Sequence, residues 1–272
     1  QLPPGDAGAV EPVPLRSVPL CETVGVLKTV EDGPMTPRAR IGYTSVAYVT
    51  EIFPKVFYDI VPDGVLLQFL TQQVTSHEKR NMERIHDEAK AAAKSFARAG
   101  ADLVILGGVP TNLSRGRGAL NHVLQGIADE IGVPVSSSAT AQSNALAAVG
   151  ARKVGVVHPS NPRRDSAHDD QLRDDGLEPM GNRSAGAIFE DYNRIPESAA
   201  YDLGRELVEE SPDIDTLLYA CPHWAVTNSI EPLERDFGVS VVTSLQAITW
   251  EGLRKCGIDD RIDGYGKLLR EH

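Results

Sequence analysis

A cysteine and a histidine that lie two residues apart, Cys221 and His223, are the side chains of this sequence best suited to move a proton. They follow 216–219, an apolar run typical of a buried parallel strand, and ligands of α/β sheets bind at the ends of such strands. A nearby helix N-terminus or imidazole stabilises a thiolate. We therefore take Cys221 as the candidate acid and His223 as its supporting group. The alternative is that both are ordinary buried residues.

An internal repeat relates the strand before Cys221 to an earlier part of the chain. The pattern of 41–45 returns as 154–158, and that of 102–110 returns as 215–223, so both patterns recur at the same offset. The constant offset indicates that one unit of structure occurs twice.

The repeat aligns Cys221 with Gly108. One strand end therefore carries a thiol, and the equivalent strand end carries no side chain. We expect the two positions to face one another across a single cleft.

Polar groups that could bind a carboxylate or a developing enolate follow the other strand ends. Thr111 and Asn112 come just after the Gly107-Gly108 turn, and Ser137 and Ser138 belong to a Ser/Thr run for which helix capping is the alternative interpretation. Four other histidines are expected to face solvent: His77, His86, His122 and His168.

The sequence gives no sign of a metal or nucleotide cofactor. Its His, Cys and Asp residues lack metal-ligand spacing, and the Gly107-Gly108 turn lacks the G-x-G-x-x-G spacing of dinucleotide-binding loops. We expect neither a metal nor a cofactor.

Strand and helix patterns alternate along the chain, which predicts an α/β fold with parallel sheets. The expected strands are 40–45, 65–70, 103–106, 133–135, 153–157, 216–219 and 239–242. The expected helices are 76–99, 117–131, one that starts at Asn161-Pro162, 201–210, one that Asn228 or Ser229 can cap, and 246–256.

The repeat predicts two pseudo-symmetric domains, each a short parallel sheet flanked by helices, with the active site in the cleft between them. The first domain is assigned to 38–138 plus 245–272 and the second to 139–244, after an N-terminal extension at 1–37. A single doubly wound sheet is the alternative, and it would leave the paired strand ends without a common cleft.

The net charge of −11 argues against nucleic acid or an anionic membrane as a partner. Three scattered cysteines favour a reducing, cytoplasmic setting, and no apolar run approaches the length of a membrane span. The expected partner is a small carboxylate substrate, and the sequence allows assembly as a homo-oligomer.

Two short motifs resemble a known superfamily. Cys221-Pro222-His223-Trp224 is similar to the Cys-Thr-His-aromatic motif of glutamate racemases, and the surroundings of Gly108 and of Gly132-Val133-Pro134 look more like arylmalonate decarboxylase. The chain from about 40 to 266 thus resembles the aspartate/glutamate racemase superfamily, most of all its arylmalonate decarboxylase and maleate isomerase branches. The resemblance implies one catalytic position on each domain, and these positions fall on Gly108 and Cys221.

A racemase needs an acid or base on each face of a planar carbanion, and one thiol serves only one face. Loss of CO₂ generates an enolate without a base, so a decarboxylase needs a single acid. The resemblance therefore implies a cofactor-independent carbon–carbon lyase that acts on a small malonate-like or dicarboxylic acid, with Cys221 protonating the enolate. The carboxylate-binding set then also includes Gly108, Val109, Ser160 and Pro222.

Two other functions are also compatible with these residues. An isomerase or racemase, of the maleate cis–trans or amino-acid type, would pair Cys221 with a second group such as His158; a carboxylate-binding protein would have lost catalysis. The chain also departs from the decarboxylase pattern. Val109 and Pro110 replace hydroxyl residues, and Pro222 lacks an N–H donor. The resemblance thus does not fix the substrate as an arylmalonate.

Overall fold

The structure is a computed structural model that describes residues 37–46, 48–73, 79–114, 116–160 and 166–272. All of these described residues belong to one compact unit. The expected extension up to residue 36 and the helix start at Asn161-Pro162 lie outside the described residues.

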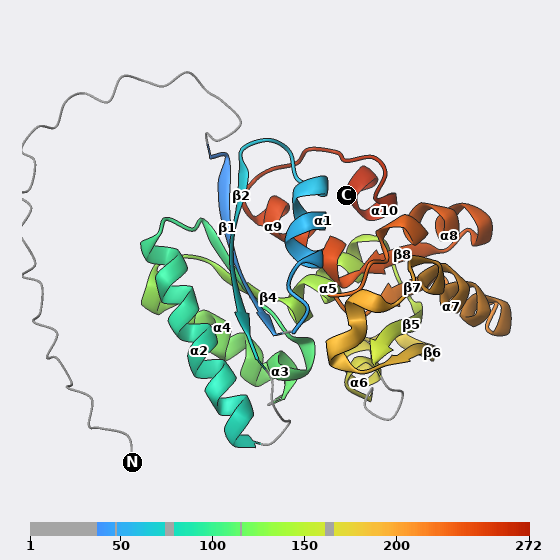
Figure 1. Ribbon diagram of the computed structural model, residues 1–272, viewed down its shortest axis with the longest axis horizontal. Helices are drawn as coiled ribbons and strands as arrows, with labels where there is room; N and C mark the ends of the chain where they lie inside the picture. Colours follow the sequence, from blue (N-terminus) through green and yellow to red (C-terminus); the bar gives the residue numbers. More distant parts are fainter. Residues whose placement is uncertain (1–36, 47, 74–78, 115, 161–165) are drawn as a thin grey trace, which may run out of the picture. The chain divides into compact units, whose positions relative to one another are not determined.

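The first four strands of the chain form a parallel sheet with the order β2-β1-β3-β4 (Figure 1). Its strands are β1 Ala39–Val46, β2 Val65–Gln72, β3 Leu103–Leu106 and β4 Val135–Ser137. The helices between and after them are α1 Ile52–Ile60, α2 Lys79–Arg98, α3 Val109–Leu113, α4 Arg117–Ile131 and α5 Ser138–Ala148.

The remaining strands form a second parallel sheet with the matching order β6-β5-β7-β8. Its strands are β5 Lys153–Ser160, β6 Glu178–Ala187, β7 Thr216–Tyr219 and β8 Ser240–Thr243. The α-helices are α6 Ser166–Asp174, α7 Glu197–Glu210, α8 Ile230–Phe237, α9 Ser244–Lys255 and α10 Gly266–Glu271, and two 3₁₀ helices are η2 Phe189–Arg194 and η3 Thr227–Ser229.

Strand register confirms the internal repeat. Gly42 of β1 pairs with Val104 of β3, and Gly155 of β5 pairs with Leu217 of β7. Both partners in the second sheet follow their counterparts in the first at the offset of the repeat. The prediction of two similar parallel sheets is confirmed, and the alternative of a single doubly wound sheet is wrong.

Each sheet is covered by helices on both faces. Helices α2 and α4 pack on the first sheet through an apolar cluster that includes Phe96 and Leu124, and α7 and α8 pack on the second through Leu207 and Leu233 (Figure 1). A separate apolar cluster contains residues of α5, α9 and strands of both sheets. Because the sheets share this core, the division of the chain into two domains stays a prediction.

None of the helices in the described residues is long and apolar enough to cross a bilayer.

The repeated glycines Gly42 and Gly155 give a test of this packing. A Cβ atom at Gly42 would lie 2.6 Å from Cδ2 of Phe96, and one at Gly155 would lie 2.8 Å from the ends of Ile214 and Leu207. The phenyl ring is rigid and the aliphatic ends yield more easily. We expect Gly42→Ala to lower the free energy of unfolding by about 1–3 kcal/mol, and Gly155→Ala by less.

Gly126, inside α4, is the matched control, because a Cβ atom there meets no heavy atom within 4 Å. Gly126→Ala should raise the free energy of unfolding by about 0.5–1 kcal/mol. Denaturant titration of the three variants measures these differences, and a Gly42→Ala protein as stable as the wild type would contradict the packing.

Candidate active site

A cavity of about 120 Å³ lies where the repeated strands end, and both Gly108 and Cys221 line it. Gly108 follows β3 and Cys221 follows β7, the two strands related by the repeat. The structure thus brings the thiol and the side-chain-free position to the same cavity.

Cys221 is buried in apolar surroundings. Its neighbours in this cluster are Val49 and Tyr192, with Phe189 packed against them. The backbone N–H of His223 donates to Cys221 Sγ at 3.4 Å. An N–H directed at sulfur favours the thiolate, whereas the apolar surroundings favour the neutral thiol. The thiol can therefore serve as a proton donor whose conjugate base is stabilised locally.

The imidazole of His223 is also buried and contacts the first half of the chain. Its Nε2 lies 2.9 Å from Ser45 Oγ, and Nδ1 has no hydrogen-bond partner among the described residues. Burial lowers the pKa of His223 to about 4, and the charge of Glu51 opposes this shift. At neutral pH the ring is therefore uncharged. The hydrogen bond from His223 to Cys221 Sγ comes from the backbone N–H.

Gly108 has a structural reason to be glycine besides the missing thiol. Its φ of 84° lies in the left-handed region, which residues other than glycine seldom adopt. A Cβ atom there would also lie 2.9 Å from Val46 Cγ2. The turn after β3 therefore leaves this part of the cavity wall to backbone atoms.

Seven of the ten predicted site residues line the cavity in the described part of the chain. They are Gly108, Val109, Ser138, Ser160, Cys221, Pro222 and His223. The other three, Thr111, Asn112 and Ser137, are buried nearby but outside this lining.

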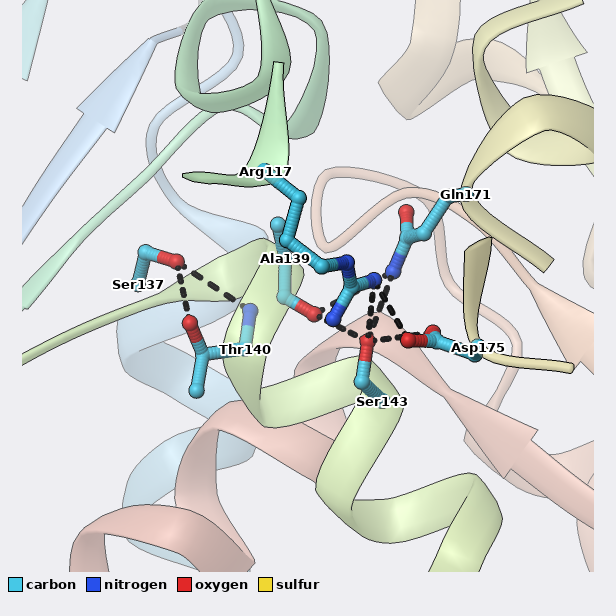
Figure 2. A network of polar contacts seen from close by, with 7 residues as sticks. All are labelled: Arg117, Ser137, Ala139, Thr140, Ser143, Gln171 and Asp175. Atoms are coloured by element: carbon cyan, nitrogen blue, oxygen red, sulfur yellow. Dashed lines mark hydrogen bonds and ion pairs between the residues drawn. The ribbon is translucent and has the colours of Figure 1, made fainter. Parts of the chain in front are cut away.

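Asn112 and Ser137 have identifiable structural partners. The Asn112 amide lies 3.0 Å from Ser138 Oγ, and its better orientation donates to that oxygen and to the carbonyl of Gly108. Ser137 accepts from Thr140 N at 3.1 Å and so caps α5, the alternative foreseen for the Ser/Thr run (Figure 2). Asn112 thus holds Ser138 in place, and Ser137 fixes the start of its helix.

His158, the second candidate acid, is buried next to the cavity. Its Nδ1 lies 3.1 Å from Ser160 Oγ, and it is Ser160 that lines the cavity. Any role of His158 toward a ligand would therefore pass through the serine hydroxyl.

The expectation that His168 faces solvent is wrong: the side chain is 4% exposed and lines the cavity. It lies on α6, which a polar network ties to α4 and α5 (Figure 2). Arg117 Nη2 lies 2.7 Å from Asp175 Oδ1 and 3.0 Å from Ser143 Oγ, and Gln171 Nε2 donates to the carbonyl of Ala139 at 3.2 Å. The network fixes the helix that places this histidine.

Several other lining residues were not predicted. The main ones are Val46, Gln142, Phe189, Tyr192 and Ser244. The repeat could have predicted Ser244. Leu106 and Tyr219 are equivalent in the repeat, and they pair with Ser137 and Thr243. The next residues, Ser138 and Ser244, are therefore equivalent as well. Thr243 also caps α9 through Gln246 N, as Ser137 caps α5.

The cavity wall has an apolar part and a polar part. Among the described lining residues there is no Lys, Arg, Asp or Glu. Ser138 and Ser244 are the first residues of α5 and α9, where helical N–H groups lack intrahelical partners and attract anions. These helix starts and the nearby hydroxyls suit a carboxylate. No group of His, Cys, Asp and Glu within the described residues could hold a metal ion.

The lowered pKa of His223 predicts a pH-dependent stability. The unfolded histidine binds a proton near pH 6.5, whereas the folded one does so only near pH 4. The contribution of His223 to the free energy of unfolding is therefore fully present above pH 6.5. About 3 kcal/mol of it is lost as the pH falls toward 4. Because glutamine does not titrate, the difference in free energy of unfolding between wild type and His223→Gln should become smaller as the pH falls from 6.5 to 4. Urea titrations at several pH values measure this difference. Curves of unfolding free energy against pH that run parallel for the two proteins would contradict the assignment.

Comparison with known proteins assigns the chain to a family. The family model for arylmalonate decarboxylase matches residues 63–269. Arylmalonate decarboxylase of Bordetella bronchiseptica is 31% identical over 198 residues, which cover 70% of this chain and 78% of that protein.

Solved structures share the fold. A liganded crystal structure of a doubly substituted arylmalonate decarboxylase superposes with a TM-score of 0.79 at 24% identity, over 86% of this chain and 100% of that one. A maleate cis-trans isomerase of Nocardia farcinica bound to TRIS gives 0.74 at 19% identity, over 86% and 98%. The match of the family model over most of the length, together with the Bordetella relative, shows that the chain belongs to the arylmalonate decarboxylase family.

Proposed function

We propose that this chain is a cofactor-independent decarboxylase that removes CO₂ from a small malonate-like acid and protonates the product through Cys221. The observation that supports it most is the pairing of one thiol with Gly108 in the wall of a single cavity. Such a site offers a sulfur acid to one face of a planar intermediate, which is what decarboxylation requires.

The carboxylate that stays on the product would bind at the polar part of the wall. Ser138 and Ser244 bring the first turns of two helices there, and Ser160 adds a hydroxyl. Hydrogen-bond donors held in place by the fold stabilise negative charge as it develops. They would therefore favour the enediolate over the bound diacid.

The carboxylate that leaves would lie against the apolar part, next to Phe189 and Tyr192. Apolar surroundings disfavour its charge, and that charge disappears as CO₂ forms. The electron pair of the broken carbon–carbon bond passes into the retained carboxylate, which becomes an enediolate.

Cys221 then transfers its S–H proton to the carbon, and the monoacid product and a thiolate result. The N–H of His223 at 3.4 Å stabilises this thiolate until it takes a proton from solvent. One proton is consumed for each CO₂ released, and the neutral imidazole contributes no charge.

An isomerase or racemase is the second candidate, supported by the 3.1 Å contact between His158 and Ser160. That contact could deliver a proton through a cavity-lining hydroxyl. Mass balance separates the functions: CO₂ release marks a decarboxylase, redistribution of isomers marks an isomerase, and binding without turnover marks a carboxylate-binding protein.

Cys221→Ala tests the proposed acid. Removal of a single general acid should lower the rate of CO₂ release by about 10²–10⁴-fold. Affinity for malonate-like acids should stay within a few-fold, because the polar part of the wall is untouched. The two quantities are measured by CO₂ assay and by calorimetry.

Cys256→Ala is the matched control. Cys256 is a half-buried thiol outside the described cavity lining, and burial together with the charge of Asp102 raises its pKa to about 11. This variant should keep wild-type turnover. A Cys221→Ala protein that releases CO₂ at the wild-type rate would refute the assignment.

A further inference from the structure

Val46, the last residue of β1, is buried and lines the cavity. It belongs to none of the apolar clusters that the described residues form. A buried valine normally stabilises a protein by packing in its core. Val46 instead contributes its apolar surface to the cavity wall.

Val46 lies on the side of the cavity that Gly108 occupies. A Cβ atom at Gly108 would lie 2.9 Å from Cγ2 and 3.2 Å from Cβ of Val46, so the valine fills the space that a side chain at this position would take. The preceding residue, Ser45, reaches the other side, because its Oγ lies 2.9 Å from Nε2 of His223. Successive side chains of a strand point to opposite faces, which turns Val46 away from the loop that carries Cys221.

The space next to Gly108 offers few hydrogen-bond partners to a water molecule. A buried water needs about two to four polar partners, whereas Val46 presents only methyl groups there. Gly108 has no side chain, and its carbonyl already accepts from the backbone N–H and from the side-chain amide of Asn112. The other side of the cavity differs, because the thiol of Cys221 and the N–H of His223 are both polar. Water is therefore expected on the thiol side of a bound intermediate and not on the Val46 side.

We infer that Val46 is a specificity-determining residue, whose methyl groups cover the face of the enediolate that is turned away from Cys221 and keep water from protonating it there. The inference rests on the proposed function, which supplies the planar enediolate. It adds the group that restricts protonation to one face, since a single thiol is sufficient only where the opposite side is closed to water.

The stereochemistry of the residual reaction in Cys221→Ala protein tests the inference. With the thiol present, a general acid worth about 10²–10⁴-fold outcompetes any water, whereas without it water has to protonate the carbon. Methylmalonate is decarboxylated in D₂O, with the enzyme concentration raised in proportion to the lower rate, and the configuration of the deuterated propionate is measured. We expect one configuration from Cys221→Ala alone. Addition of Val46→Ser should move the product toward an equal mixture, because serine leaves room for a water and offers a hydroxyl that binds it.

Two variants in the same Cys221→Ala background are matched controls. Val46→Thr brings the same hydroxyl but keeps the branched shape, so it leaves no room for water and should preserve the single configuration. Val49→Ser opens space beside Cys221 instead of beside Gly108, because Val49 is a buried valine that packs in the cluster of Cys221 and lies outside the described cavity lining. It should preserve the single configuration as well. Val46→Ala replaces Val46→Ser should the serine variant not fold.

A crystal structure of the Val46→Ser protein provides a readout that needs no turnover. We expect an ordered water next to the introduced hydroxyl and in contact with Gly108, at a place where a wild-type crystal has none. This water decides the inference if Cys221→Ala releases too little CO₂ for stereochemical analysis.

Three results would overturn the inference and leave the proposed decarboxylation standing: a single configuration after Val46→Ser, an equal mixture already in Cys221→Ala alone, or the absence of the water. If the wild type releases no CO₂ from methylmalonate, the proposed activity fails. The inference then falls with it, because no enediolate forms.

Discussion

Helices α5 and α9 pack against one another, and the cavity depends on that contact. Each helix begins directly after the last strand of one sheet, so their packing brings the carboxyl ends of both sheets to one place. Buried polar groups fix the register between them. Glu251 of α9 accepts from Ser136 at 2.8 Å and from Asn144 of α5 at 3.0 Å, and Gln142 donates to Ser244. A shift of one helix along the other would break these bonds and separate the two halves of the site.

The site is electrically unlike the rest of the chain. The protein carries a net charge of −11, yet the described cavity lining has no charged side chain and includes a histidine that stays neutral at physiological pH. An anion in this cavity would be bound by N–H groups, hydroxyls and the N-terminal ends of two helices. Because these groups are dipoles, no charged side chain has to be removed from water to form the site. This arrangement would hold a carboxylate without forming a strong ion pair, which suits the proposed reaction, in which one of two carboxylates must leave.

The sequence predicted the parts of the fold that are periodic or repeated. The constant offset of the repeat predicted that β1 and β3 pair in the same register as β5 and β7, because equivalent residues keep the same separation along the chain. Helix α5 was missed because it is Ala-rich and buried on most of its surface, so it lacks an apolar stripe, and β6 was missed because a half-exposed, Gly-containing strand does not alternate. Cys221 and Gly108 could be foreseen at one cavity, whereas His168 and Gln142 could not, since their direction depends on how α6 and α5 pack.

The central claim is that one thiol serves one face of the intermediate, and the stereochemistry of the wild-type reaction tests it most directly. Methylmalonate is decarboxylated in D₂O, and the amount and configuration of deuterium at C2 of the propionate are measured. With Cys221 as the only cysteine among the described lining residues, the account predicts one deuterium per CO₂, in a single configuration. An equal mixture of the two configurations would show that protons reach both faces, and it would contradict the account.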